Sequence, residues 1–238
     1  MKNLLLATTM LAALGAAPAE AKLQLSIGVG ASVFTCSDGQ LGCDLSGGAN
    51  NLLIVNQSVG GAFVQIALAQ SSFGAHNELQ LSSSNIINQT GAPLTIKLLA
   101  SDTNFLDPVS FIRNSGSLTF NDAVGSGTSS LAFWADAANT QGANPTNTPG
   151  TLLEQVFGSP SSNPDSFSGS NLAAFLANSP FSMTEGASLS LIGGGSITGF
   201  NQSMTSGVPE PSTWAMFGIG FALMGFMGFK RRTARFAL

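Results

Sequence analysis

His76 is the only histidine in the 238-residue chain and lies in the segment Phe73-Gly-Ala-His-Asn-Glu78. An imidazole beside a serine and an acid could make that serine a nucleophile. However, the chain has no Gly-x-Ser-x-Gly elbow, and none of its many serines stands out. The acidic residues are scattered singly, whereas glycoside hydrolysis needs two carboxylates about 5–9.5 Å apart. We therefore expect a surface or turn histidine, and a protein that is not an enzyme.

Two further segments carry side chains that could bind a ligand. Asp102-Thr-Asn-Phe-Leu-Asp107 offers oxygen atoms at loose spacing, but it lacks the acidic pattern and terminal glutamate of a calcium loop. We expect a turn at a strand end there, and no metal or cofactor in the chain. Phe133 and Trp134 are adjacent, and an exposed aromatic ring could stack on a sugar. Alternation along a strand would turn one of the two into the core.

The charge of the chain excludes one large class of partners. Between residues 22 and 207 there are ten acidic residues and three basic ones, a net charge of −7. Binding to nucleic acid needs clustered Lys and Arg, so the protein is not expected to bind it. Charged residues make up only 8% of the chain, far below the usual quarter. The surface must therefore consist largely of Ser, Thr, Asn, Gln and Gly.

The first 21 residues have the layout of a secretory signal peptide. A lysine at position 2 precedes the apolar segment Leu4–Ala13, which only two threonines interrupt. Ala19-Glu20-Ala21 fits the small-x-small rule for cleavage, so the cut is expected between Ala21 and Lys22. The apolar segment is too short for a permanent anchor. The sequence therefore predicts export.

Cys36 and Cys43 are the only cysteines. An even count in an exported chain favours a disulfide, and the Asp38-Gly39 turn between them makes closure of the short ring easy. Reduced thiols and a metal site are the alternatives. A metal held by two thiolates would need further ligands, for which His76 is the only imidazole.

The C-terminal segment predicts a membrane anchor. Residues 214–229 are sixteen residues without a charge, about 24 Å of helix at about 1.5 Å per residue. By the positive-inside rule, the basic residues after this span halt translocation and stay in the cytoplasm. These membrane-stop residues are Lys230, Arg231, Arg232 and Arg235. The alternative, a buried core helix, is disfavoured by its cationic end.

Pro209-Glu210-Pro211, the glycine-rich apolar span and the basic end, taken in this order, resemble the PEP-CTERM sorting signal of Gram-negative bacteria. The resemblance covers about thirty residues. It implies that an exosortase, a membrane transpeptidase-like enzyme, recognises Pro209, Glu210 and Pro211 and cuts near them. The protein would then be an inner-membrane precursor first and a cell-surface or extracellular protein afterwards. Tails of this kind accompany exopolysaccharide production, which implies an association with exopolysaccharide.

Between the two ends, the pattern predicts an all-β fold, an antiparallel β-sandwich or jelly roll, over residues 22–200. Apolar and polar residues alternate at period two in 23–29, 78–82, 117–120 and 188–191, which is typical of half-buried strands. Further strands are expected at Leu52–Val55, Ala62–Leu68, Leu94–Leu99, Leu131–Asp136, Phe181–Thr184 and Ile197–Phe200.

The remaining segments are expected to be irregular or helical. Residues 137–150 and 158–170 are rich in Asn, Pro, Ser and Gly, which predicts exposed loops. Leu152–Phe157 and Leu172–Asn178 could each form one or two turns of helix. Residues 201–207 are interpreted as a polar spacer between the sandwich and the tail at 208–238.

Three functions remain open for the body of the protein. The first is a non-catalytic surface or extracellular-matrix protein. The second is a secreted hydrolase acting on surface polysaccharide, which would need converging carboxylates. The third is a carbohydrate-binding module, which would need a row of exposed aromatic rings, although the chain has no tyrosine and only two tryptophans.

Overall fold

The computed structural model describes residues 22–73, 76–106, 108–142, 144, 148–178, 180–207, 219 and 221. The predicted signal peptide with Ala21, the motif at 209–211 and the basic residues from Lys230 to Arg235 lie outside the described residues. The predicted membrane helix at 214–229 also lies outside them, except for two residues. None of the helical residues that are described forms a segment with the length and hydropathy of a membrane span.

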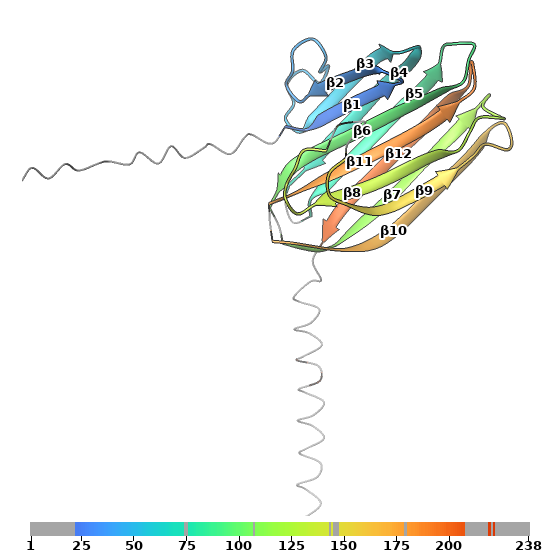
Figure 1. Ribbon diagram of the computed structural model, residues 1–238. Helices are drawn as coiled ribbons and strands as arrows, with labels where there is room; N and C mark the ends of the chain where they lie inside the picture. Colours follow the sequence, from blue (N-terminus) through green and yellow to red (C-terminus); the bar gives the residue numbers. More distant parts are fainter. Residues whose placement is uncertain are drawn as a thin grey trace, which may run out of the picture.

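Two six-stranded sheets pack face to face, and every pairing within them is antiparallel (Figure 1). Sheet A contains, in spatial order, β2 (Ser32–Ser37), β1 (Gln24–Val29), β6 (Leu94–Phe105), β11 (Phe181–Leu191), β8 (Ser129–Asp136) and β9 (Thr151–Gly158). Sheet B contains β10 (Asp165–Ala177), β7 (Val109–Asn121), β12 (Ser196–Gly207), β5 (Glu78–Asn88), β4 (Ala62–Ser72) and β3 (Leu52–Val59). The prediction of an all-β sandwich is therefore confirmed.

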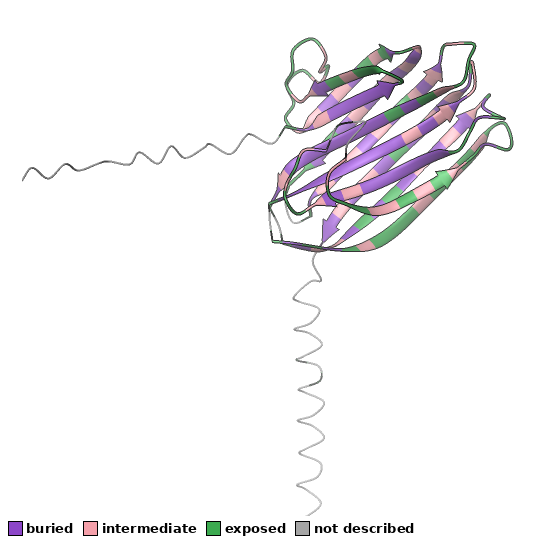
Figure 2. Ribbon diagram, in the orientation of Figure 1, coloured by how far each residue is buried: buried purple, intermediate pink, exposed green. Residues whose placement is uncertain are grey.

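Buried residues alternate with less buried ones along strands of both sheets, and the buried set forms the core. Figure 2 shows this alternation as purple segments separated by pink and green ones. In β11, Phe181, Met183, Leu189 and Leu191 are fully buried, whereas Ser188 and Ser190 are only partly buried. Period-two alternation places the apolar set of each strand on one face, which must be removed from water. The whole core cluster lies between Leu23 and Met204. Residues 22–207 thus contain a complete hydrophobic core.

The predicted strands are confirmed by the structure. Each expected range overlaps an observed strand, although Phe181–Thr184 and the stretch at 188–191 are parts of one long strand, β11. The predicted loop at 137–150 contains no strand among its described residues. The short strand β2 was not predicted. It follows β1 after a two-residue turn at Gly30 and Ala31, and Gly30 has a positive φ of 58°.

The two predicted helices are wrong. Residues 152–157 belong to β9, which pairs with β8, and residues 172–177 belong to β10, which pairs with β7. Each segment is too short to form a stable helix alone, and pairing with a long neighbouring strand satisfies its backbone instead. The prediction of a loop over 158–170 is wrong from Asp165 onward. The strand β10 begins there, and its backbone pairs with β7.

The interpretation of residues 201–207 as a spacer is also wrong. These residues form the second half of β12, which lies between β5 and β7 in the middle of sheet B. Gln202, Met204 and Ser206 point inward and are buried. The alternation of these residues with Asn201, Ser203 and Thr205 was hidden by the polar composition of the segment. The sandwich therefore extends to Gly207.

Candidate functional site

A groove of about 310 Å³ lies on the outer face of sheet A. Its size falls within the range of roughly 300–1,000 Å³ that is usual for sites of small ligands. Four strands, β6, β11, β8 and β9, form its floor, and Thr148 from the β8–β9 connection lines one side. The lining residues are Lys97, Leu99, Ser130, Ala132, Trp134, Thr148, Gln155, Gly186, Ala187 and Ser188.

Trp134 is the one aromatic ring among the described lining residues of this groove. Its neighbour Phe133 is fully buried in the core, as the alternation of β8 requires. In the next strand, Gly186 leaves space for the indole. A β-carbon added at Gly186 would stand only 2.8 Å from Cζ3 of Trp134 and 3.3 Å from Cη2. The indole therefore lies directly against the backbone of β11.

The start of the β8–β9 connection is fixed to sheet A beside the groove. The side-chain amide of Gln141 donates to the carbonyl of Ser101 at 2.7 Å, and the backbone N–H of Gly142 donates to the Ser101 hydroxyl at 2.8 Å. The hydroxyl of Thr184 also bonds to that of Ser101, at 2.9 Å. These bonds hold a segment of irregular backbone against the outer face of β6 and β11.

The groove offers an indole plane, serine and threonine hydroxyls, the amide of Gln155 and the amine of Lys97. Among its described lining residues there is no carboxylate and no histidine. Such a set can stack against an apolar face of a ligand and exchange hydrogen bonds with its hydroxyl groups. It lacks the paired acids of a glycosidase. The groove is thus chemically suited to binding a polar ligand through stacking and hydrogen bonds.

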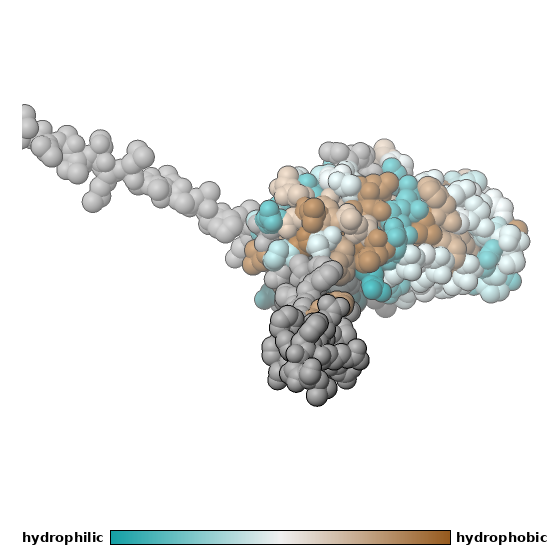
Figure 3. Space-filling view, turned by 90° about the horizontal axis from the view of Figure 1, so that it is seen from below, coloured by the Kyte–Doolittle hydropathy of each residue, from teal (hydrophilic) through white to brown (hydrophobic). Residues whose placement is uncertain are grey.

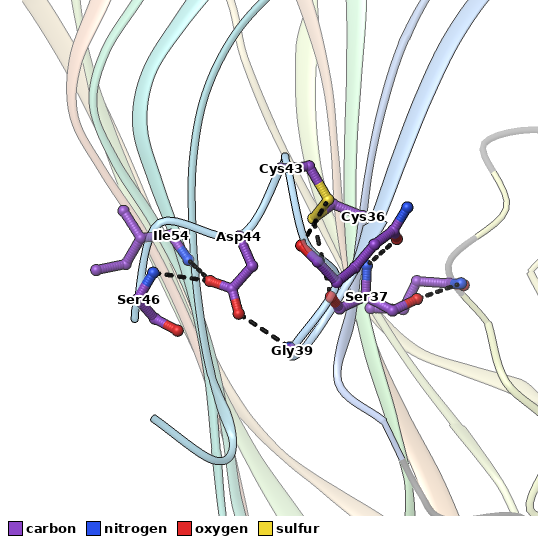
Figure 4. Close-up of a disulfide and its surroundings, with 9 residues drawn as sticks. Cys36, Ser37, Gly39, Cys43, Asp44, Ser46 and Ile54 are labelled. Carbon is purple, nitrogen blue, oxygen red and sulfur yellow. Dashed lines mark hydrogen bonds between the residues drawn. A yellow bond between two sulfur atoms is a disulfide. The ribbon is translucent and has the colours of Figure 1, made fainter. Parts of the chain in front are cut away.

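The disulfide Cys36–Cys43 is present, with a Cα–Cα distance of 6.0 Å. Figure 4 shows how Asp44, directly after the ring, turns its carboxylate back into the loop. This carboxylate accepts backbone N–H bonds from Gly39 and Ser46, both at 2.9 Å, and from Ile54 at 3.4 Å. Burial would raise the pKa of Asp44, but these donors outweigh it and lower the pKa below its usual value. The disulfide and this carboxylate together fix the loop between β2 and β3.

The other residues considered for chemistry do not come together. His76 is exposed in the β4–β5 connection. Asp102, in contrast, is fully buried in β6. The Ser71 hydroxyl and the Thr103 N–H donate to its carboxylate. Asp107 lies outside the described residues. Among the described residues there is no cluster of three or more His, Cys, Asp or Glu side chains that could hold a metal ion.

Sequence reasoning missed Glu185, which is fully buried in β11. Its inward position follows the same period-two register as Met183 and Leu189, so the alternation could have revealed it. Burial raises its pKa well above the usual value, and the nearby Glu78 adds to this effect. The backbones of Leu81 and Met204 oppose the shift, yet neither carboxyl oxygen has a partner in hydrogen-bond geometry. Burial therefore favours the protonated form of Glu185, and its position in the core separates it from the groove on the outer face of sheet A.

Residues 207–232 match the family described as the PEP-CTERM protein-sorting motif. The match includes Pro209, Glu210 and Pro211 together with the whole apolar span 214–229 and the first three basic residues after it. The chain is thus a PEP-CTERM domain-containing protein, and the motif marks it as an exported protein that is sorted to the cell envelope or surface. A search of curated proteins found no matching sequence.

A comparison with solved structures found matches at low similarity. Murine APRIL at pH 5.0 is 6% identical, with a TM-score of 0.33, over 79% of this chain and 99% of that one. TmCBM61 in complex with β-1,4-galactotriose is 8% identical, with a TM-score of 0.30, over 56% and 85%. The C-terminal CBM6 of LamC from Zobellia galactanivorans is 13% identical, with a TM-score of 0.25, over 58% and 87%. Similarities at this level do not assign a ligand to this chain.

Proposed function

We propose that the protein is a non-catalytic surface or extracellular-matrix protein that an exosortase processes after export. The observation that supports processing is the sorting motif at residues 207–232. In the precursor, the uncharged span 214–229 anchors the chain in the inner membrane, and the basic residues after it hold its end in the cytoplasm. Two prolines around Glu210 keep the motif out of the helix, which leaves its backbone open to an enzyme.

Replacement of Pro209, Glu210 and Pro211 with alanine tests this step. We expect unprocessed protein in the membrane fraction, with a mass that includes Leu238. Replacement of Ser212 and Thr213 with alanine is the matched control and should leave processing unchanged. If the triple-alanine variant is cut and released like the parent, the motif is not the recognition mark.

For the mature protein we propose association with a neutral exopolysaccharide through the groove at Trp134. The supporting observation is the indole lying close against Gly186 among hydroxyl and amide groups, with no carboxylate among the described lining residues. A sugar ring presents C–H groups on its face and hydroxyls at its rim, which matches this arrangement. The net charge of −7 between residues 22 and 207 disfavours anionic polymers.

Binding of the purified protein to neutral and to anionic polysaccharides, measured by affinity electrophoresis, tests this association. Trp134→Ala should weaken binding to the neutral polymer by about tenfold or more, which corresponds to about 1.4 kcal/mol. Leu172→Ala, an exposed apolar residue on sheet B, is the control and should bind like the parent. Equal binding by both variants would exclude the groove, and release of reducing ends from the polymer would favour the hydrolase instead.

A further inference from the structure

The end of the sandwich where β12 finishes carries an unusual number of exposed apolar side chains. At this end Gly207 pairs with Phe111 of β7, and Val109 of the same strand pairs with Ala177, the last residue of β10. Leu152, near the start of β9, is exposed here. The exposed apolar residues in the connections and sheet B strand ends here are Leu41, Leu45, Phe73, Leu106 and Leu176. Figure 3, which views the molecule from below, shows apolar atoms mixed with hydrophilic ones over the left and middle of this face, and pale, near-neutral surface on the right.

These five side chains form what we call the apolar end. Its most exposed members are Leu41, at 97%, and Leu176, at 79%. At the opposite end of the sandwich, the exposed large apolar residues of the described chain are Val33, Val124 and Phe157. The five side chains of the apolar end are spread across it, from the β2–β3 connection at one edge of the sandwich to β10 at the other. Exposed leucine side chains cost free energy in water, so several of them at one end indicate a surface that is covered by something.

The apolar end is held rigidly. The ring of Phe73 stacks on that of Phe105 at 5.0 Å, and Phe105 contacts Phe181 at 5.5 Å, so an aromatic chain runs from the surface into the core. Leu41 lies inside the disulfide ring of Cys36 and Cys43. Rigid display lowers the entropy cost of contact with a partner, because these side chains need little further ordering.

The position of the tail limits what can cover this end. Six residues separate Gly207 from Trp214, the first residue of the uncharged span. Even fully extended, the seven steps between them reach about 25 Å at roughly 3.6 Å per residue. If the span crosses the membrane as proposed above, Gly207, at the apolar end, lies within that distance of the bilayer.

Four described acidic side chains lie at this end, those of Asp38, Asp44, Glu78 and Asp136, and anionic lipids repel exposed carboxylates. Those of Asp38, Asp44 and Asp136 are bound by backbone N–H groups, which turns them away from the surface. Leu41 and Leu45, on either side of Asp44, are exposed instead. Apolar side chains of this kind insert about 5–10 Å into the boundary between headgroups and acyl chains.

We propose that the apolar end is a membrane-contact surface that rests on the outer face of the inner membrane while the precursor is anchored. This contact holds residues 209–211 at the membrane surface, at the depth where a membrane-embedded processing enzyme works. The proposal depends on the proposed anchoring by the tail. Its partner is lipid, and no second protein is required.

The test uses the full chain reconstituted in vesicles of phosphatidylethanolamine and phosphatidylglycerol. Because both native cysteines form a disulfide, Leu106→Cys supplies one thiol for an environment-sensitive fluorophore. Val124→Cys, at the opposite end, is the matched control. Lipids with a spin label near the headgroup should quench the fluorophore at residue 106 at least threefold more than at residue 124. Equal, weak quenching at both positions would overturn the proposal.

Flotation of the same vesicles separates this proposal from the proposed anchoring. A chain that does not float with the lipid lacks the anchor, whereas one that floats without quenching at residue 106 lacks only the contact. In the labelled chain, the combined substitutions Leu41→Ser, Leu45→Ser and Leu176→Ser should reduce quenching at residue 106 at least twofold. The control pair Val33→Ser and Phe157→Ser, at the opposite end, should leave this quenching unchanged. All five positions are exposed, so neither set removes a core residue. Unchanged quenching in the first set would also overturn the proposal.

Discussion

The hydroxyl of Ser71 in β4 donates to the buried carboxyl of Asp102 in β6, and this bond connects the two sheets through the core. Burial raises the pKa of Asp102 to about 6, although the Ser71 hydroxyl and the Thr103 N–H both oppose the shift. The folded protein thus holds a proton on Asp102 at pH values where the unfolded chain has lost it.

This relationship predicts a pH dependence of stability. Because the pKa of Asp102 is raised by folding, its contribution is complete below about pH 4 and is lost as the pH rises through about 6. A shift of about two units corresponds to roughly 3 kcal/mol in the free energy of unfolding. Urea unfolding of residues 22–207 between pH 4 and pH 7 should show this decline. Asp102→Asn should remove most of it, and a slope unchanged by that substitution would contradict the assignment.

Glu185 should affect stability in the same direction, over a window that begins near pH 4.5 and extends upward. Both of its carboxyl oxygens are buried without a partner, and each such group costs about 1–3 kcal/mol. Glu185→Met, of similar length, should therefore raise the free energy of unfolding at pH 7, and the gain should shrink at pH 4. Chemical denaturation at the two pH values measures this. If Glu185→Met is instead less stable than the parent at pH 7, the carboxyl group of Glu185 is stabilised by hydrogen bonds in the core.

Gly186 should control the position of the indole in the groove. Gly186→Ala places a methyl group 2.8 Å from Cζ3 of Trp134, which forces the ring away from β11. We expect a several-fold loss of binding to neutral polysaccharide and a change in tryptophan fluorescence, with little change in fold. Gly91→Ala is the control, because a β-carbon there meets nothing within 4 Å. Parent-like binding by the Gly186 variant would show that the ring position does not matter.

The sequence predicted the strands whose apolar residues alternate with polar ones, such as Leu79 and Leu81 in β5. It did not predict β10, because 166–170 is a Ser- and Gly-rich segment that resembles a loop. There, Ser168 and Ser170 pair with Ser117 and Ser115 of β7, so neighbouring backbone rather than side-chain pattern decides the structure. Only part of the groove could be predicted from the sequence, because pairing between neighbouring strands decides the rest. Alternation separates Trp134 from Phe133, but the glycine beneath the indole follows from the register between β8 and β11.

The C-terminal limit of the folded domain gives the last prediction. Residues 201–207 pair with β5 on one side and β7 on the other, and they bury Met204 and Gln202. The side-chain amide of Gln202 also donates to the carbonyls of Gly186 at 3.1 Å and of Ala132 at 3.4 Å in the opposite sheet. A chain of residues 22–207 should therefore fold, whereas one that stops at residue 200 loses half of a central strand.

We expect cooperative thermal unfolding and resistance to protease for the longer chain only. The shorter chain should be unfolded or aggregated, because unpaired backbone in the middle of a sheet and an opened core destabilise it by several kcal/mol. Limited proteolysis and circular dichroism of the two chains, expressed side by side with the disulfide formed, give the comparison. If the chain ending at residue 200 melts at the same temperature as the longer one, the second half of β12 is a spacer after all.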